Sequence, residues 1–505
     1  MKEQNHIYHS LWKSIMSFSP VVIIGTIYCI ECISSEGFYH PDEHFQIVEF
    51  AKWKMGESTP SSMAWELPAH IRPSLQPCLC MLMLYMCHIC GLDNPFVQAN
   101  VLRALSMLLS VTAMTMFYRV NKNTIRNEYR GMYLFMSFLL WFLPAINVRF
   151  SSETLSGSFL LMSLSIVLKL KDTPERSDII LGFLLGLSFA LRYQVAFAYI
   201  GLMLWALFFK HYCMRKYAFI LLGFAVIILA CTVLDSWFYG EWVFAPYSYF
   251  KVNILDGVAA SFGKMPWYSY LEMIFERPTI IVGCIIIVSL VLAVTCHYRH
   301  PAVWCIVTFL IGHSMIAHKE LRFIFPIVNI LPLLIIWSME KLLVNRALRI
   351  SAISIFLMVN VGGLTMLAFK PAAYGKAKMM RLVTNEWHKG KCVYASSAGN
   401  PFLVAGFLEP SFYKPNEMII HNFYYDIEQC NRSERQNRLE NGVVILAERE
   451  KAEREWLMSQ GAEKEKRSVP LWVERLNVFY KVYDPQWTLM MYEKNNKKDD
   501  YEKNM

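Results

Sequence analysis

The sequence predicts an α-helical polytopic membrane protein that ends in a small α/β domain. Of its 505 residues, 55% are hydrophobic and only 18% are charged, whereas a soluble chain of this length carries more charge. Several apolar runs approach or exceed the roughly 18 residues that cross a bilayer as a helix. Alternating patterns typical of membrane barrels are absent, so the spans are expected to be helices.

About eleven apolar segments are candidate transmembrane helices. They lie at residues 15–33, 98–118, 131–148, 154–169, 179–191, 194–209, 217–235, 279–297, 301–317, 323–341 and 350–369. A further run, 76–92, fits either a span or a helix lying along the membrane surface. The membrane domain is therefore expected to cover residues 1–370.

The basic loops give an orientation. With a cytoplasmic N-terminus and 76–92 at the interface, all short Lys/Arg-rich loops, such as "RVNKNTIRNEYR" (119–130) and "KHYCMRK" (210–216), fall on the cytoplasmic side. The net charge of +9 is then explained by orientation, and no nucleic-acid partner is expected. The remaining loops converge on the exoplasmic face: "HPDEHFQ" (40–46), "NVRFSSET" (147–154), "LRYQ" (191–194), "DSWFYGEWVFAPYSYFKVN" (235–253) and "HKELRF" (318–323).

Residues 371–505 read as a soluble exoplasmic α/β domain. They contain a strand-like piece, "GVVILAE", a charged helical stretch, "EREKAEREWLMSQ", and a glycosylation sequon at Asn431. The last residues, "YEKNNKKDDYEKNM", are expected to be disordered. The 13 cysteines lie mostly in apolar runs, as buried apolar side chains do, so a zinc site is not expected.

The first exoplasmic loop, 34–75, places Asp42 and Glu43 directly after the first span. Pro41 suits the first turn of a helix, and the stretch "PDEHFQIVEFAKWK" has one apolar side that can lie on the membrane. A carboxylate held there can act as general base toward a hydroxyl group. The alternative is a helix cap with a solvated face.

Five further charged residues stand at the ends of spans on the same face: Arg149, Arg192, His318, Lys319 and Arg322. Charges at that depth are costly unless they are paired or functional. Arginine grips a phosphate with two parallel hydrogen bonds, so a carboxylate with several cations suits hydroxyl attack on a donor that leaves as a phosphate. The alternative is snorkelling, or ion pairs with Glu153 or Glu320.

Motifs for soluble nucleotide donors are absent. There is no GxxxxGK[ST] loop, no GxGxxG after a strand and no Asp-x-Asp. His40 and His44 are four residues apart, but a helix that starts at Pro41 barely includes His40. We therefore expect a lipid-linked phosphate donor and no metal.

Seven motifs together resemble one family. "HPDEHFQ" after the first span, "AWELPAHIRPS" (64–74), "RFSSETLSG" (149–157), "LRYQ" (191–194), "DSWFYGEWVFAPYSYFKVNIL" (235–255), "FGKMPWYSYL" (262–271) and "HKELRFIFPI" (318–327) occur in this order. They resemble the GT-C mannosyltransferases of glycosyltransferase family twenty-two. The "HPDE…Q" and "HKE.RF" motifs look most like the branch that adds the third, α-1,2-linked mannose of glycosylphosphatidylinositol (GPI) precursors.

The resemblance implies a GT-C fold and an inverting transfer from dolichyl- or polyprenyl-phosphate mannose to a glycolipid acceptor in the membrane, without a cofactor. Asp42 would be the general base and Glu43 its neighbour, while Arg149, Arg192, His318, Lys319 and Arg322 would neutralise the leaving lipid phosphate. The remaining substrate contacts would be His40, Gln46, Trp65, Glu66, Arg72, Trp267 and Tyr268, with Trp65, Glu66 and Arg72 at the acceptor entrance and Trp267 and Tyr268 stacking on sugar.

The implied location is the endoplasmic reticulum membrane in a eukaryote and the inner membrane in a bacterium, with an exoplasmic active site. Three other functions remain open. One is a family member acting on dolichol-linked oligosaccharide or a bacterial glycolipid. A lipid-linked sugar transporter would favour midplane charges and internal repeats. A non-catalytic scaffold would have no need of intact acidic and basic motifs.

Overall fold

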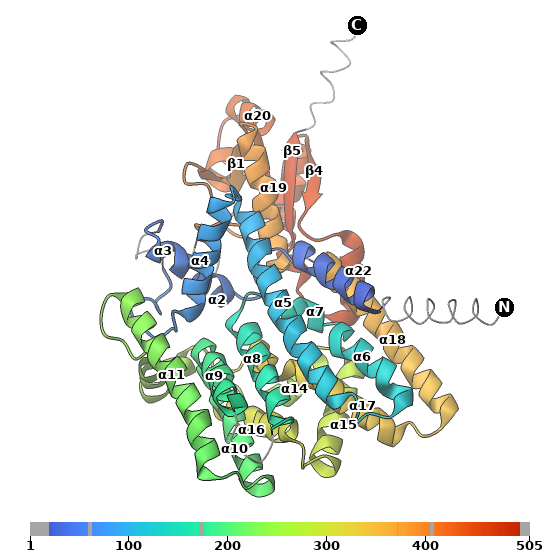
Figure 1. Cartoon of the computed structure of the whole chain (residues 1–505). Coiled ribbons are helices and arrows are strands. Elements are labelled where there is room, and N and C mark those ends of the chain that lie inside the picture. Colours follow the sequence, from blue (N-terminus) through green and yellow to red (C-terminus); the bar gives the residue numbers. More distant parts are fainter. Residues whose placement is uncertain (1–19, 59–62, 171–175, 371, 404–408, 495–505) are drawn as a thin grey trace, which may run out of the picture. The chain divides into compact units, whose positions relative to one another are not determined.

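A computed structural model describes residues 20–58, 63–170, 176–370, 372–403 and 409–494 (Figure 1). The chain divides into two compact units. Unit 1 comprises residues 1–33, 68–78 and 102–368, and unit 2 comprises 34–67, 79–101 and 369–505. Unit 2 thus takes in most of the first predicted exoplasmic loop in addition to the tail. The predicted division at residue 370 stays a prediction.

Unit 1 is helical. After the helix Pro20–Ser34, its elements are most of α5 (Pro95–Asn121), η3 (Asn127–Tyr129), α6 (Arg130–Leu139), α7 (Leu143–Asn147), α8 (Ser152–Val167), α9 (Arg176–Leu191), η4 (Tyr193–Val195), α10 (Ala196–Phe209), α11 (Met214–Tyr239), α12 (Ala245–Phe250), η5 (Lys251–Leu255), α13 (Val258–Ser261), α14 (Ser269–Glu276), α15 (Ile280–Cys296), α16 (Pro301–Met315), η6 (Leu321–Ile330), α17 (Leu331–Leu342) and most of α18 (Arg346–Phe369).

Within the described residues, four helices are long and apolar enough to cross a membrane: Pro95–Asn121, Met214–Tyr239, Leu321–Leu342 and Ala347–Phe369. Shorter helices cover the other predicted spans, except residues 131–148. Residues 76–92 correspond to α4 (Leu75–Ile89), whose 15 residues are divided between the units. The expected total of about eleven spans, and the membrane position of α4, stay predictions.

The predicted span 131–148 is not one continuous helix, because the helix breaks between α6 and α7. Leu140 is extended at the end of α6, and Pro144 stands in the first turn of α7. The buried amide of Asn360 on α18 satisfies both broken ends, accepting from the Trp141 N–H at 2.8 Å and donating to the Leu139 carbonyl at 2.6 Å. A side chain from a distant helix therefore satisfies the backbone groups at the break, which the local sequence pattern does not predict.

Glycines allow close helix packing in unit 1. A Cβ on Gly157 of α8 would lie 2.7 Å from the Cα of Pro326 in η6, and one on Gly182 of α9 would meet the backbone of α11 at Gly223. Backbones can approach this closely only where the side chain is a hydrogen. The contact at Gly157 holds η6 against the first half of α8.

Unit 2 begins with a continuous helical segment formed by α2 (Pro41–His44), the π-helical η1 (Phe45–Glu49) and α3 (Phe50–Lys54). This confirms the predicted helix, with Pro41 in its first turn. The later elements of the unit are η7 (Ala373–Gly375), α19 (Lys376–His388), η8 (Tyr424–Glu428), α20 (Arg432–Glu440), α21 (Lys451–Ser459), α22 (Leu471–Tyr480) and η9 (Pro485–Trp487), and the five strands.

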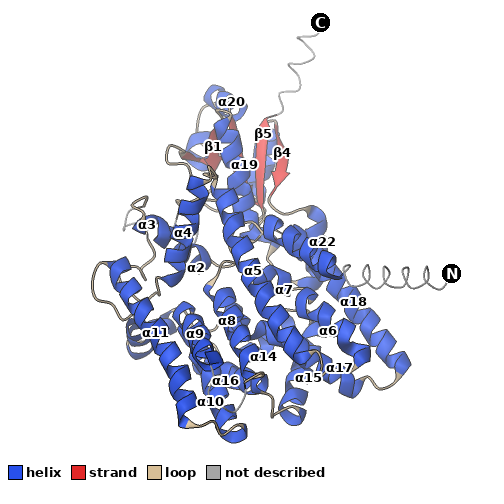
Figure 2. Ribbon diagram, in the orientation of Figure 1, coloured by secondary structure: helices blue, strands red, loops and turns tan. Residues whose placement is uncertain are grey.

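All strands in the described residues belong to one mixed sheet of unit 2 (Figure 2). They are β1 (Cys392–Ala395), β2 (Ile420–Asn422), β3 (Gly442–Ala447), β4 (Ala462–Arg467) and β5 (Leu489–Lys494), in the order β2-β1-β3-β5-β4. β1 pairs in parallel with β2 and β3, whereas β5 is antiparallel to β3 and β4. Strand β3 is buried along its whole length, as its unbroken apolar sequence predicts.

The predicted disorder of residues 492–505 is wrong at its start. Residues 492–494 are part of β5, where Tyr492 pairs with Val444 of β3 and is buried. Pairing to a central strand overrides the polar composition of the tail. Residues 495–505 lie outside the described part of the chain.

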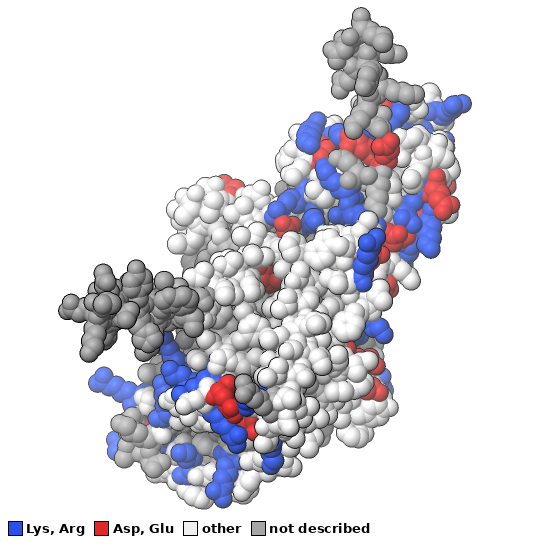
Figure 3. All heavy atoms as spheres, turned by 90° about the vertical axis from the view of Figure 1, so that its right-hand side faces the viewer, with Lys and Arg blue, Asp and Glu red and all other residues white. Residues whose placement is uncertain are grey.

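Figure 3 shows a broad white area without charged side chains, with Lys and Arg gathered outside it. On α18, Ile355, Met358 and Val361 are each more than half exposed. Exposed apolar side chains along a long helix are what a helix in contact with lipid presents.

Candidate active site

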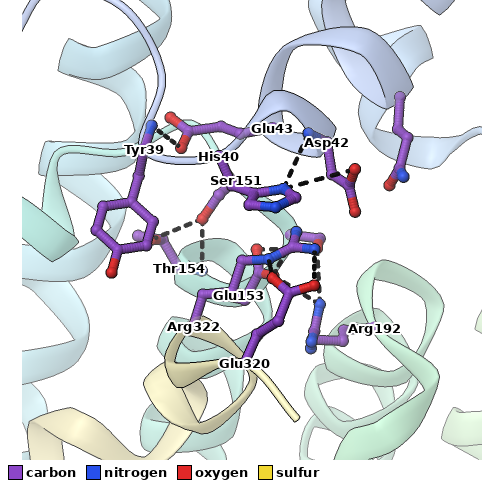
Figure 4. A network of polar contacts seen from close by, with 12 residues as sticks. Tyr39, His40, Asp42, Glu43, Ser151, Glu153, Thr154, Arg192, Glu320 and Arg322 are labelled. Atoms are coloured by element: carbon purple, nitrogen blue, oxygen red, sulfur yellow. Dashed lines mark hydrogen bonds and ion pairs between the residues drawn. The ribbon is translucent and has the colours of Figure 1, made fainter. Parts of the chain in front are cut away.

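An ion-pair network lies in unit 1 where α8, the end of α9 and the start of η6 meet (Figure 4). Arg192 Nη1 lies 2.8 Å from Glu153 Oε1, and Arg322 Nη1 lies 3.5 Å from the same oxygen. Arg322 Nε also contacts Glu320 Oε2 at 2.5 Å. His318 Nε2 reaches the other oxygen of Glu320 at 2.9 Å. Three of the five predicted cationic residues therefore share two carboxylates.

Local structure holds each member in place. Ser151 caps α8 by accepting the Thr154 N–H at 3.2 Å, so Glu153 sits in the first turn, where a carboxylate is favoured by the helix dipole. Arg192 follows the last residue of α9, and Glu320 precedes the first residue of η6. The Gly157–Pro326 contact then sets the distance between α8 and η6.

Arg192 is the most unusual member of the network. Its side chain is 5% exposed, yet among the described residues its Nε and Nη2 have no hydrogen-bond acceptor. Its guanidinium lies 5.0 Å from the Phe323 ring, and that of Arg322 lies 5.1 Å from the same ring. A buried guanidinium with unsatisfied nitrogens is costly, so the position favours an anionic ligand.

Lys319 and Arg149 are also buried in unit 1. Lys319 Nζ donates to the main-chain oxygens of Ile316, at 2.6 Å, and Met265, at 3.1 Å. Burial lowers the pKa of its ammonium below the usual range. Arg149 lies in the short segment between α7 and the Ser151 cap.

Arg192, Arg322 and His318 thus form the ion pairs with Glu153 and Glu320 that the sequence offers as the alternative to a phosphate site. Pairing does not use every donor of the network, because Nε and Nη2 of Arg192 have no acceptor among the described residues. The network can thus be stable alone and still attract an anion.

Asp42 and Glu43 occupy the first turn of α2 in unit 2 and differ in their contacts (Figure 4). Glu43 Oε2 accepts the Tyr39 N–H at 2.9 Å, which is a helix-capping contact. Asp42 Oδ1 lies 3.5 Å from His40 Nδ1, which also accepts the Asp42 N–H at 3.3 Å. Side-chain exposure of 29% leaves Asp42 within reach of a ligand from solvent.

Sequence reasoning missed Glu49 and gave His44 only a weak metal role. Glu49 is fully buried and accepts hydrogen bonds from Ser411 Oγ at 2.5 Å and the Phe412 N–H at 3.0 Å, while His44 Nε2 lies 2.8 Å away. Burial raises the pKa of Glu49, but these bonds outweigh it and hold the pKa below its ordinary value. The sequence signal that could have indicated Glu49 is the position of its carboxylate on the apolar side of the helix 41–54.

The predicted substrate contacts fall into separate places. In unit 2, Gln46 Nε2 donates to the buried Glu66 at 3.0 Å, and Trp65 is 40% exposed. In unit 1, Arg72 lies 5.8 Å from the Tyr249 ring. Trp267 and Tyr268 contact each other edge to face, and both are exposed, Trp267 at 69%. Exposed aromatic rings of this kind suit stacking on sugar.

No set of metal ligands is assembled in the part of the chain that the structure describes. Three or more His, Cys, Asp or Glu side chains do not gather there. His40 and His44 face different carboxylates, Asp42 and Glu49.

Among solved structures, the fold is similar to that of ArnT from Cupriavidus metallidurans. The crystal structure of ArnT bound to undecaprenyl phosphate matches with a TM-score of 0.55 at 10% identity, covering 94% of this chain and 97% of that one. Its apo state matches with a TM-score of 0.53. The chain therefore has the helical membrane-protein fold of ArnT, as the sequence predicts.

Curated relatives are GPI alpha-1,2-mannosyltransferase 3 from several animals. The Bos taurus protein is 23% identical over 320 residues, 61% of this chain and 56% of the relative. The Homo sapiens protein is 24% identical over 59% and 53%, and the Danio rerio protein 24% over 81% and 73%. The chain thus matches little more than half the length of the first two. The model of the Alg9-like mannosyltransferase family matches residues 19–397, so the chain belongs to that family.

Proposed function

We propose that the chain is an inverting α-1,2-mannosyltransferase that moves mannose from dolichyl- or polyprenyl-phosphate mannose to a GPI precursor. Membership of the Alg9-like family supports mannosyl transfer, and the name of the relatives supports the acceptor and the linkage. The single observation that carries the proposal is Arg192, a buried guanidinium with two nitrogens that have no acceptor among the described residues.

The phosphate side of the reaction belongs to unit 1. Nε and Nη2 of Arg192 would donate to the phosphate oxygens of the lipid-linked sugar donor, and Arg149, His318, Lys319 and Arg322 would add positive charge. Charge develops on this phosphate as the sugar leaves, so donors fixed in place beforehand lower the barrier. ArnT is a structural neighbour with bound undecaprenyl phosphate, which supports a polyprenyl phosphate as the lipid.

The base is Asp42. The acceptor hydroxyl oxygen attacks C1 of mannose, the bond between C1 and the phosphate oxygen breaks, and its electron pair goes to the phosphate. The hydroxyl proton passes to the Asp42 carboxylate. A single displacement at a β-linked donor yields an α-mannoside. His40, 3.5 Å from Asp42 Oδ1, orients the base, and Glu43 fixes the start of α2.

The acceptor is proposed to enter past Trp65, Glu66 and Arg72, with Gln46 holding Glu66 in place. Trp267 and Tyr268 are proposed to stack on sugar rings. Both substrates carry lipid chains, so the reaction takes place at a membrane. A GPI precursor as acceptor implies the endoplasmic reticulum membrane, with the active site on its exoplasmic face.

The test is a transfer assay with purified protein and polyprenyl-phosphate mannose, offering either a GPI-type acceptor or a dolichol-linked oligosaccharide. We expect mannose on the GPI-type acceptor, in an α-1,2 linkage by product analysis. Transfer to the oligosaccharide alone would show that the protein belongs to another branch of its family. Absence of transfer to both acceptors would reject the proposed activity.

A further inference from the structure

Helix α22 of unit 2 presents an apolar face to its surroundings, and the proposed function gives that face no role. Leu471, Trp472, Val478 and Phe479 are exposed, Val478 at 77% and Phe479 at 57%. They are spaced i, i+1, i+7 and i+8, so they lie on one side of the helix. Large apolar side chains gathered on one exposed face mark a surface that makes contact with a partner.

The opposite side of α22 holds the helix on unit 2. Val473, Asn477 and Tyr480 are buried there. The Asn477 carboxamide bonds the chain that follows the helix: its Nδ2 donates to the Tyr483 carbonyl at 2.7 Å, and its Oδ1 accepts the Val482 N–H at 3.0 Å. The apolar face is therefore held in a fixed orientation on unit 2.

The exposed charges of α22 and its C-terminal end are positive. Arg475 is exposed four residues before Phe479, on the same side of the helix, and Lys481 is exposed directly after the helix. Glu474, the acidic residue of the helix, is only partly exposed and pairs with Arg467. Long basic side chains can extend from an apolar face to phosphate headgroups, and tryptophan is enriched at the boundary of membrane and water. This combination favours a lipid surface.

Two contacts within unit 2 connect this face to the end of a membrane span. Phe369 belongs to unit 2 and is the last residue of α18, which is long and apolar enough to cross a bilayer. Its ring is exposed and lies 5.1 Å from the Trp472 ring, edge to face. Lys370 follows, with Nζ 5.3 Å from the Tyr483 ring. A span leaves the hydrocarbon at its end, so Trp472 lies at the level where the membrane surface begins.

We propose that α22 is an interfacial helix that attaches unit 2 to the lipid bilayer beside the end of α18. Leu471, Trp472, Val478 and Phe479 contact acyl chains, and Arg475 lies among the headgroups. The inference goes beyond the proposed function, because it concerns the attachment of unit 2 to the membrane and not the reaction. Burial of one large apolar side chain favours association by about ten- to a hundredfold, so four of them make a stable attachment.

The test uses the full chain in nanodiscs that hold one copy each, with a phosphatidylcholine that carries a photoactivatable diazirine on its acyl chain. After illumination, mass spectrometry of the digested protein locates the attached lipid. We expect label on α22 at Trp472, Val478 or Phe479, as well as at Met358 of α18. The matched control is Met458 of α21, an exposed apolar side chain of the same unit that is expected to stay unlabelled.

Two labelling patterns would overturn the proposal. Label at Met358 without label on α22 would show that the face does not contact lipid, and would assign it to a protein partner. Equal label on α22 and at Met458 would show that the diazirine reports exposure and not contact with the membrane.

A pair of variants tests the face itself. Val478→Asp replaces an apolar contact by a charge, so label at Trp472 is expected to fall about tenfold. Met458→Asp, the same kind of substitution outside the face, is expected to leave that label unchanged. Both side chains are exposed, so both variants should melt at the wild-type temperature. Wild-type label at Trp472 in a Val478→Asp protein that melts normally would contradict attachment through this face.

Lipid contact and transfer fail separately, because the label is measured without donor or acceptor. The Asp42→Asn variant is expected to keep the label on α22, since Asp42 lies on a different helix. An unlabelled α22 in a protein that transfers mannose would reject the attachment and leave the transferase. A labelled α22 in a protein without transfer would reject the transferase and leave the attachment.

Discussion

Arg192 decides, at the level of single residues, whether the network of unit 1 serves a phosphate or only structure. Arg192→Lys keeps the charge but loses the planar fork, so one or two hydrogen bonds to the phosphate disappear. We predict a fall in kcat/KM for the lipid-linked mannose donor of about ten- to a hundredfold, since a charged hydrogen bond contributes about 1.5–3 kcal/mol. Initial rates at varied donor concentration measure this.

The control for that variant is Arg349→Lys. Arg349 also pairs with a carboxylate, Glu128 at 2.8 Å, but it is partly exposed and lies outside the network. The two lysine variants should differ clearly in kcat/KM for the donor. Equal, small losses in both would leave Arg192 a purely structural residue.

Glu49 gives a prediction about pH. Its pKa lies below the ordinary 4.5 in the folded chain, so its contribution to stability is full above the unfolded value and is lost as the pH falls through the folded value. Glu49→Ala should lower the free energy of unfolding by about 1–3 kcal/mol at pH 7. The gap in melting temperature between wild type and variant should narrow on acidification below pH 4.5. A constant gap from pH 7 to pH 4 would contradict this role.

The sequence indicates which charged residues are functional candidates, because charge at the end of a membrane span costs free energy. It does not indicate which residues they contact. Asp42, Arg192 and Arg322 stood out because charge at the end of a span is expensive. Glu49 did not, because its partners Ser411 and Phe412 lie more than 360 positions away. Similarly, the pairing of Arg192 and Arg322 with one carboxylate depends on how α8, α9 and η6 pack.

Elements set the geometry of the network, and Gly157 tests this. Gly157→Val places a branched side chain against the Pro326 backbone, so α8 and η6 must move apart and Arg322 loses its contact with Glu153. We predict reduced transfer together with a lower melting temperature. Gly131→Val is the control, since nothing lies within 4 Å of a Cβ there. Equal activity in the two variants would remove the role of this contact.

The break between α6 and α7 shows the limit of prediction for elements. The apolar run continues through residues 131–148, and the amide of Asn360 supplies hydrogen bonds to the two broken ends that the local sequence does not reveal. The helix 41–54 and strand β3 were predictable because their signals are local: a proline in the first turn and an unbroken apolar run. The pairing of residues 492–494 with the sheet is again a tertiary effect.

At the scale of the whole molecule, the orientation in the membrane is the open prediction, and two exposed cysteines test it. Cys213 lies in a loop assigned to the cytoplasm, and Cys392 in the region assigned to the exoplasmic face. In sealed vesicles with the cytoplasmic side outward, an impermeant maleimide should label a variant retaining only Cys213. A variant retaining only Cys392 should react only after detergent is added. Labelling of Cys392 in sealed vesicles would reverse the predicted topology.

The overall architecture was largely predictable because composition and basic loops are global signals. The helical membrane fold agrees with the likeness to ArnT, and the family agrees with the motifs. The two compact units were not predictable, since unit 2 joins residues 34–67 and 79–101 to the chain after 369. Which loop packs on which domain is decided by contacts such as Glu49 with Ser411.

Mannosyl transfer by the Asp42→Asn variant tests the central claim most directly. The substitution keeps the shape of the side chain and removes the base, whose contribution is about 10²–10⁴-fold. With polyprenyl-phosphate mannose and a GPI-type acceptor, we predict that the rate of transfer falls by at least about 10²-fold. Membrane insertion and donor binding should match the wild type. Transfer at the wild-type rate by an inserted, donor-binding Asp42→Asn protein would contradict the assignment of Asp42 as the base.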